Sequence, residues 1–206
     1  MKPGTLVAFE GIDGSGKSTQ LQRLAAYLDA KGWDPLTTRE PTDGPHGRRI
    51  RTMARSGERV APETELEWFM EDRRQHVTEV VLPALTAGRC VLTDRYTLSS
   101  VAYQGARGLN PEQILQRCEA EFPIPDLVIL LVVDADAGLA RVRARGGVAE
   151  PSFEQAEFLE AAQSIFASLT CPYLERVDAS DTPDRVQAGV TELLGRRLSL
   201  GRGPPG

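Results

Sequence analysis

The sequence has few cysteines and no closely spaced pair of them. Cys90, Cys118 and Cys171 lie far apart without a C-x-x-C motif, so neither a structural zinc site nor a disulfide framework is expected. A sparse, odd number of cysteines is typical of a reducing compartment. We therefore expect a cytoplasmic protein.

Long apolar segments and an excess of positive charge are also lacking. No apolar run approaches the roughly 20 residues that a bilayer-spanning helix needs, and the first residues show no signal-peptide pattern. The 29 acidic residues outnumber the 24 basic ones, which gives a net charge of −5. Proteins that bind nucleic acid usually carry a basic surface. We therefore expect neither a membrane nor a nucleic acid as a partner.

The chain has the composition of one ordinary globular domain. It has 206 residues, of which 41% are hydrophobic and 26% are charged, so it can bury a sizeable core. No linker, repeat or low-complexity tract interrupts it. We predict a single domain over residues 1–200 and a disordered tail over residues 201–206, because that tail has nothing to pack.

Apolar strand-like runs alternate with amphipathic helical stretches along the whole chain. This order favours an α/β fold in which helices cover both faces of a parallel sheet. A loop is expected over residues 41–47, and a helix that carries Arg141 should stop at Gly146 and Gly147. Strands are predicted at residues 5–9, 35–38, 91–93, 127–133 and 174–177, and further helices at residues 18–30, 62–85, 111–121, 152–169 and from 183 onward.

A phosphate-binding motif follows the first predicted strand. Residues 11–18 read GIDGSGKS and match G-x-x-x-x-G-K-S/T at every fixed position. The glycines let consecutive N–H groups point at an anion, Lys17 adds a positive charge for the β- and γ-phosphates, and Ser18 offers a hydroxyl to Mg²⁺. The alternative is a flexible loop that contains glycine and lysine by chance. Its place between a strand and a helix favours nucleotide binding.

The motif alone does not identify the reaction, because motors, GTPases and transporters also carry it. The sequence has no N-K-x-D guanine signature, and motor or transporter ATPases are usually longer. A chain of this length fits a small-molecule kinase better.

Four segments together resemble the thymidylate kinase family, bacterial type. They read FEGIDGSGKST from Phe9, REP from Arg39, F-x-x-x-R from Phe69, and DRYTLSSVAYQ from Asp94. The resemblance covers the chain from Thr5 to about Asp178. It implies a P-loop NTPase-like three-layer α/β/α fold with a lid over about residues 141–154, a homodimer, and Mg²⁺-dependent transfer of the γ-phosphoryl group of ATP to dTMP. Another nucleoside-monophosphate kinase and a non-catalytic ATP-binding regulatory module remain as alternatives.

Phe69 and Arg73 are four residues apart, so they share one face of a predicted helix. An arginine in an apolar stripe needs a partner, because an unpaired buried charge is very costly. That partner is either a carboxylate of this chain or, as the resemblance implies, O4 of a thymine that stacks on Phe69. The resemblance also implies that Arg95 bridges the two phosphate groups, although an exposed arginine at a helix start is the alternative.

The resemblance assigns further roles around the acceptor. Ser100 and Gln104 resemble residues that read the N3 edge of thymine, and Tyr103 resembles the one that crowds the sugar 2′ position. Asp13 is expected near the 3′-hydroxyl or the metal shell. Motif and resemblance together assign ATP to Gly11, Ile12, Asp13, Gly14, Ser15, Gly16, Lys17, Ser18, Thr19 and Arg141; dTMP to Arg39, Glu40, Arg51, Phe69, Arg73, Arg95, Ser99, Ser100, Tyr103 and Gln104; catalysis to Lys17, Arg95, Asp13 and Arg145; and Mg²⁺ to Ser18 and Asp94.

The chain departs from the family pattern at two places. Thr42, Asp43 and Gly44 stand where the family usually has Gly-Gly-Thr, so Asp43 adds negative charge near an anionic substrate. The lid segment lacks the usual Asp-Arg pair, and Arg145 is our candidate for the lid cation. Helical spacing puts Arg141 and Arg145 on one face, where plain surface charges are the alternative.

Overall fold

A computed structural model describes residues 4–57, 59–144 and 153–198 and confirms the predicted α/β fold class. Its five strands form one parallel sheet in the order β2-β3-β1-β4-β5, so the first strand lies in the middle. The strands are β1 (Thr5–Glu10), β2 (Pro35–Arg39), β3 (Cys90–Asp94), β4 (Leu127–Val132) and β5 (Leu174–Asp178).

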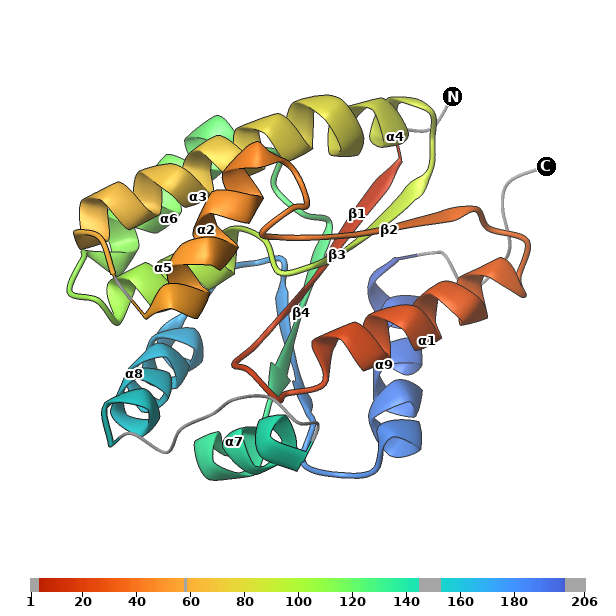
Figure 1. The fold of residues 1–206 in the computed structure, drawn as a ribbon. Coiled ribbons are helices and arrows are strands. Elements are labelled where there is room, and N and C mark those ends of the chain that lie inside the picture. The colour runs from red at the N-terminus through yellow and green to blue at the C-terminus, as the bar shows by residue number, and fades with distance from the viewer. Residues whose placement is uncertain (1–3, 58, 145–152, 199–206) are drawn as a thin grey trace.

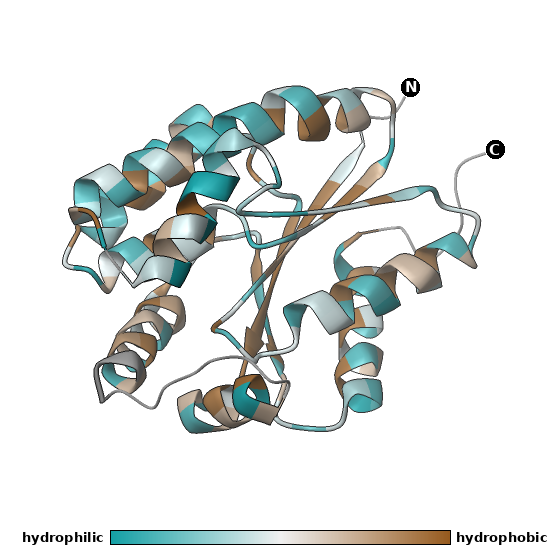
Figure 2. Cartoon of the chain, viewed as in Figure 1, coloured by the Kyte–Doolittle hydropathy of each residue, from teal (hydrophilic) through white to brown (hydrophobic). Residues whose placement is uncertain are grey.

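The central strands are apolar on both faces because helices cover both sides of the sheet. Every residue of β1 from Leu6 to Glu10 is buried, and so are the first five residues of β4. In the edge strands β2 and β5, by contrast, every residue but Leu174 is partly buried or exposed. Figure 2 shows the same contrast as hydrophobic central strands inside helices with hydrophilic outer surfaces.

The helices form the two outer layers (Figure 1). Helices α1 and α9 pack on each other on one side of the sheet, while α2, α3, α5, α6 and α8 gather on the other. The helices are α1 (Lys17–Asp29), α2 (Pro45–Ser56), α3 (Pro62–His76), a π-helical turn η1 (Val77–Val81), α4 (Leu82–Thr86), α5 (Thr97–Gly105), α6 (Pro111–Glu121), α7 (Ala135–Ala144), α8 (Phe153–Ser168) and α9 (Pro183–Arg197).

Local sequence signals placed most of these boundaries correctly. The helix predicted over residues 111–121 is α6, and Asn110 caps it: its side-chain oxygen accepts hydrogen bonds from the backbone N–H groups of Glu112 (2.9 Å) and Gln113 (3.1 Å). Pro111 occupies the first helical turn. The predicted helix over residues 62–85 corresponds to α3, η1 and α4, which follow one another without a break.

Two helices were not predicted. The loop expected over residues 41–47 is wrong from Pro45, where α2 begins, and α5 was not predicted as a helix. Only Gly47 and Ile50 of α2 are buried, so its sequence has no apolar stripe. Helix α5 has the opposite property, because nearly all its residues are buried and no polar face reveals the helical period.

Some predictions fall outside the described residues. They are the end of the Arg141 helix at Gly146 and Gly147, most of the lid over residues 141–154, and the tail over residues 201–206. Within the described residues, no helix combines the length and the apolar character needed to cross a membrane.

Candidate active site

The phosphate loop connects the central strand β1 to helix α1, so its N–H groups lie at the positive end of that helix. Gly14 has a φ of +81°, and a Cβ atom there would lie 2.0 Å from the carbonyl oxygen of Gly138 at the start of α7. Gly16 has a φ of +97°, and apart from its own helix and chain neighbours no atom of the described residues lies within 4 Å of where its Cβ would be. The loop therefore packs tightly on α7 on one side and is open on the other.

Lys17 bends back over this loop. Its Nζ donates hydrogen bonds to the carbonyl oxygens of Gly11 (3.0 Å) and Ile12 (2.9 Å), and the side chain is buried. Burial, together with the like charge of Arg95, lowers the pKa of Lys17 to about 8. The ammonium group is held where an anion in the loop would stabilise it.

Ser18 and Asp94 meet beside the loop. The hydroxyl of Ser18 donates to a carboxylate oxygen of Asp94 at 2.5 Å, although the two residues are 76 positions apart in the sequence. Hydroxyl and carboxylate oxygens suit Mg²⁺, which usually takes only one or two protein ligands besides phosphate and water. The described residues include no group of three or more His, Cys, Asp or Glu side chains that could hold a metal. Ser18 and Asp94 therefore fit a nucleotide-bound Mg²⁺.

Arg95 follows directly on β3 and adopts a left-handed backbone conformation, with a φ of +71°. Its guanidinium group donates to Asp13 (2.6 Å), Ser99 (3.1 Å) and the hydroxyl of Tyr103 (3.3 Å), and lies over the Tyr103 ring. The side chain is only 17% exposed, unlike the surface arginine that was the alternative. The charge of Arg95 lowers the pKa of Asp13.

Glu10, the last residue of β1, holds the segment after β3 in place. One carboxylate oxygen accepts from the backbone N–H groups of Tyr96 (2.9 Å) and Ser99 (3.0 Å), and the other accepts from the hydroxyl of Ser99 (2.5 Å). These contacts satisfy donors at the start of α5. Burial raises the pKa of Glu10. The strand that precedes the phosphate loop therefore also positions Arg95.

Two cavities meet at Arg95. A cavity of 340 Å³ lies over the phosphate loop and is lined by Lys17, Ser18 and Asp94, among others. A second, more apolar cavity of 460 Å³ is formed mainly by α2, α3, α5, α7 and α8. Asp13 and Arg95 line both. The second cavity brings together the predicted dTMP residues Arg51, Phe69, Arg95, Ser99, Ser100, Tyr103 and Gln104.

Arg73 has a carboxylate partner within the chain. It is 1% exposed and, among the described residues, is not one of those that line the second cavity. Its guanidinium donates to Glu40 (2.8 Å), to the carbonyl oxygen of Tyr96 (2.9 Å) and to the hydroxyl of the cavity residue Ser100 (2.9 Å). The intramolecular ion pair that the sequence left as an alternative is therefore present. Contact of Arg73 with a base stays a prediction.

Glu40 also contacts a histidine to which the sequence assigned no role. One Glu40 oxygen lies 3.0 Å from Nδ1 of His76, whose Nε2 lies 2.7 Å from the hydroxyl of Thr38. Burial alone would raise the pKa of Glu40, but Arg73 and His76 outweigh it and lower that pKa. A chain of buried contacts thus runs from β2 through Glu40 to Arg73 and the cavity wall.

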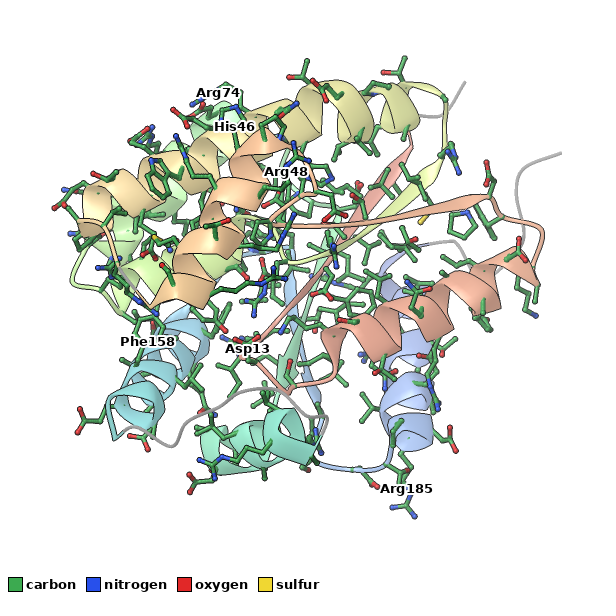
Figure 3. All side chains as sticks on the ribbon, in the orientation of Figure 1. Asp13, His46, Arg48, Arg74, Phe158 and Arg185 are labelled. Carbon is green, nitrogen blue, oxygen red and sulfur yellow. The ribbon has the colours of Figure 1, made fainter. Side chains whose placement is uncertain are left out.

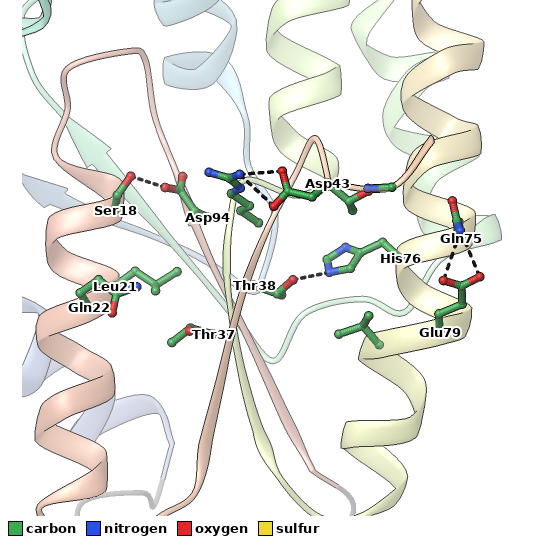
Figure 4. A pocket seen from close by; sticks show the side chains of 14 residues that line it. Ser18, Leu21, Gln22, Thr37, Thr38, Asp43, Gln75, His76, Glu79 and Asp94 are labelled. Carbon is green, nitrogen blue, oxygen red and sulfur yellow. Dashed lines mark hydrogen bonds and ion pairs between the residues drawn. The ribbon is translucent and has the colours of Figure 1, made fainter. Parts of the chain in front are cut away.

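Arg39 and Arg51 converge on Asp43, the residue that departs from the family pattern. Nη2 of Arg39 donates to both Asp43 carboxylate oxygens (2.8 and 3.0 Å), and Nη2 of Arg51 donates to one of them (2.9 Å). Figure 4 shows Asp43 and the Ser18–Asp94 pair in a 570 Å³ cavity between α1, β2 and α3, which Arg39 also lines. The hydrogen bonds from Arg39 lower the pKa of Asp43. Two predicted phosphate-binding cations are therefore already paired.

The sequence matches known proteins over nearly its whole length. The family model described as thymidylate kinase matches residues 9–190. A thymidylate kinase of Desulfotalea psychrophila is 45% identical over 198 residues, which cover 96% of this chain and 98% of that protein. Thymidylate kinases of Akkermansia muciniphila and Xanthomonas euvesicatoria are 42% and 45% identical, covering 96% and 97% of this chain and 94% and 89% of theirs. The chain belongs to the thymidylate kinase family.

Membership in the thymidylate kinase family confirms the resemblance that the motifs indicated. It does not test the individual residue roles, which stay predictions. Arg145 lies outside the described residues. Arg141, predicted to bind ATP, donates to the carbonyl oxygens of Ala179 (2.9 Å) and Ser180 (3.3 Å), just beyond the end of β5.

Sequence reasoning missed several residues of this thymidylate kinase site. Glu10 had a signal, because a carboxylate ends an otherwise apolar strand next to the phosphate motif. Phe158 had none: it lies on α8, and its ring is 5.9 Å from that of Tyr103. Figure 3 labels Phe158 and Asp13, which both line the second cavity. Arg59 stacks on Phe158 and lines the same cavity.

Proposed function

We propose that this chain transfers the γ-phosphoryl group of ATP to dTMP and releases dTDP and ADP. One observation carries the proposal. The phosphate cavity and the more apolar cavity share Asp13 and Arg95 in their walls. A donor phosphate in one cavity and an acceptor phosphate in the other would therefore meet at a guanidinium group, which is what phosphoryl transfer requires.

On the donor side, the residues of the phosphate loop bind the ATP phosphates. N–H groups from Gly11 to Gly16 surround them, Lys17 neutralises charge on the β- and γ-phosphates, and Thr19 and Arg141 complete the ATP site. Ser18 and Asp94 would hold Mg²⁺, which supplies Lewis-acid stabilisation of the phosphate oxygens when bound. Arg95 stabilises the charge that develops on the moving phosphoryl group.

On the acceptor side, Phe69 stacks on thymine, while Ser100 and Gln104 read its N3 edge and Tyr103 excludes a 2′-hydroxyl. Asp13 lies near the 3′-hydroxyl, Ser99 orients Arg95, and Arg39 and Arg51 bind the dTMP phosphate. Glu40 and Arg73 contribute to dTMP binding through Ser100: Glu40 holds Arg73, and Arg73 donates a hydrogen bond to the hydroxyl of Ser100. The cavity supports these assignments, because its surface is mainly apolar and α5 contributes Ser99, Ser100, Tyr103 and Gln104 to it, next to charged groups from other elements such as Asp13, Arg51 and Arg95.

The remaining parts of the proposal concern the whole protein. We infer a single catalytic domain over residues 1–200, a lid over about residues 141–154 in which Arg145 is the added cation, a homodimer, and a cytoplasmic location. An arginine supplied to the transition state is worth about 10³-fold or more in rate, so Arg145→Ala should slow turnover strongly.

The first experiment measures ADP release with Mg-ATP and, in parallel, dTMP, dUMP, dCMP, UMP and dGMP. Turnover with dTMP well above that with the others is expected. A preference for another monophosphate would overturn the base assignment and leave the phosphate chemistry intact. ATP binding without any turnover would indicate the non-catalytic module. Lys17→Ala should abolish turnover, whereas Lys31→Ala, which changes an exposed lysine at the end of α1, should not.

A further inference from the structure

The side-chain amide of Gln104 has a hydrogen-bond partner for its nitrogen but, among the described residues, none for its oxygen. The residue is 1% exposed and lines the 460 Å³ cavity. Its Nε2 donates to Oε1 of Glu65 at 3.0 Å. Its Oε1 is buried and has no hydrogen-bond partner among the described residues. A buried acceptor without a partner is costly in a protein on its own, and it points to a ligand that supplies a donor.

The orientation of this amide is dictated by Glu65. An ionised carboxylate has no proton to donate, so only the NH₂ group of Gln104 can face it. Turning the amide over would bring two acceptor oxygens together in a buried place. The oxygen of Gln104 is therefore the atom that remains for the cavity.

Glu65 is itself held in one position. It is 5% exposed, and its second carboxylate oxygen forms an ion pair with Arg107. Arg107 also donates to the carbonyl oxygen of Val60 at 2.9 Å, which ties it to the start of α3. The ion pair fixes the Glu65 carboxylate in place against Gln104.

We propose that Glu65, anchored by Arg107, is a positioning residue that selects the base through Gln104. It holds the amide with its oxygen toward the cavity, so the ligand must present an N–H donor there. Thymine and uracil carry a proton on N3, whereas N3 of cytosine is an acceptor and would face the Gln104 oxygen. An amide free to turn over would accept either base, so Glu65 is what makes Gln104 discriminate. The inference rests on the proposed function, in which this cavity takes the base of a monophosphate.

The test replaces Glu65 with glutamine in the full chain and compares dTMP with dCMP. The introduced side-chain amide can donate to Gln104 or accept from it, so the Gln104 amide can adopt both orientations. The ratio of kcat/KM for dTMP to that for dCMP should fall about tenfold or more, which is the discrimination that one hydrogen-bonded base edge supplies. The KM for ATP should stay within about twofold, because the phosphate loop is untouched.

Glu67→Gln is the matched control. Glu67 lies on the same helix, forms an ion pair with Arg117 and is about half-exposed, so the same chemical change leaves the cavity intact. It should leave the dTMP/dCMP ratio unchanged.

Glu65→Gln leaves Arg107 without a carboxylate, so folding is checked by thermal unfolding. If the single variant unfolds below the assay temperature, the double variant Glu65→Gln/Arg107→Gln, which has no unpaired charge, is measured instead. An unchanged ratio, or an equal loss for dTMP and dCMP, in a folded variant overturns the inference. A wild-type protein that does not prefer dTMP overturns the proposed function itself, so the two failures are distinguishable.

Discussion

The phosphate loop and the second cavity, which takes the base in the proposed function and is called the base cavity below, are built in opposite ways. The loop is one run of residues from Gly11 to Ser18, and its lysine is held by carbonyl groups of the loop itself. The base cavity is assembled mainly from five helices that the chain reaches at widely separated positions. Phosphate binding is therefore encoded locally, while base recognition depends on how distant helices pack. The following predictions separate these two dependencies, from the largest expected effect to the smallest.

Arg95→Ala removes the guanidinium group that lines both cavities, and kcat should fall about 10³-fold, because an arginine at a phosphoryl transition state is worth that much or more. Alanine and arginine both carry a Cβ, so the left-handed backbone is equally strained in either. Steady-state kinetics check this, with Arg23→Ala as a control that removes an exposed ion pair with Asp184. A fall of less than about tenfold in kcat would contradict the role of Arg95.

Phe69→Ala should weaken the binding of dTMP and leave the binding of ATP unchanged. Stacking of one base on an aromatic ring is worth ~1–3 kcal/mol, so the KM for dTMP should rise about 5- to 100-fold. ATP binding, measured by titration calorimetry, should be unchanged because Phe69 lines only the second of the two cavities. An equal weakening of ATP and dTMP binding would show that Phe69 supports the fold and not the base.

The loop itself should respond to pH. In the unliganded protein the pKa of Lys17 is lowered to about 8, and bound ATP raises it by adding negative charge. Binding then takes up a proton above pH 8, and ATP affinity should fall about tenfold between pH 7 and pH 9. Calorimetry in two buffers of different ionisation enthalpy measures this uptake. The uptake should be absent in Lys17→Met, and a wild-type affinity that is flat over this range would refute the assignment.

Asp43→Asn should slightly strengthen the binding of dTMP. The Asp43 carboxylate pairs with Arg39 and Arg51, which we propose bind the dTMP phosphate, so under that proposal it competes with the phosphate for both. Because exposed ion pairs are weak, the KM for dTMP should fall only about two- to fivefold. The control is Asp34→Asn, which alters an exposed pair with Arg89. A rise in KM would mean that Asp43 holds the two arginines in position for the phosphate instead of competing with it.

The features that could be predicted from the sequence are those that depend on residues close together in the chain. The phosphate motif, the bounds of α6 and the central strands all follow from residues within a few positions of one another. The family resemblance also assigned Ser100 and Gln104 to the base, and both line the second cavity.

Contacts between helices could not be predicted in the same way. Gln104 faces Glu65, 39 residues away, and Arg73 meets Glu40, 33 residues away. Both pairings depend on how α3 and α5 pack and on where β2 ends, and no local pattern encodes either. The partner of Arg73 therefore stayed open at the sequence level, and α5 gave no amphipathic signal because it is buried on nearly every side.

The close approach of Gly14 and Gly138 limits how this protein can vary. A Cβ at residue 138 would lie 2.7 Å from the carbonyl oxygen of Asp13, and both sides of the contact are backbone, so no smaller neighbour can compensate. In a saturation library, position 138 should therefore tolerate substitution as poorly as the glycines of the motif. The phosphate-binding site then requires one more glycine than the motif G-x-x-x-x-G-K-S/T contains, and this glycine, Gly138, lies on α7.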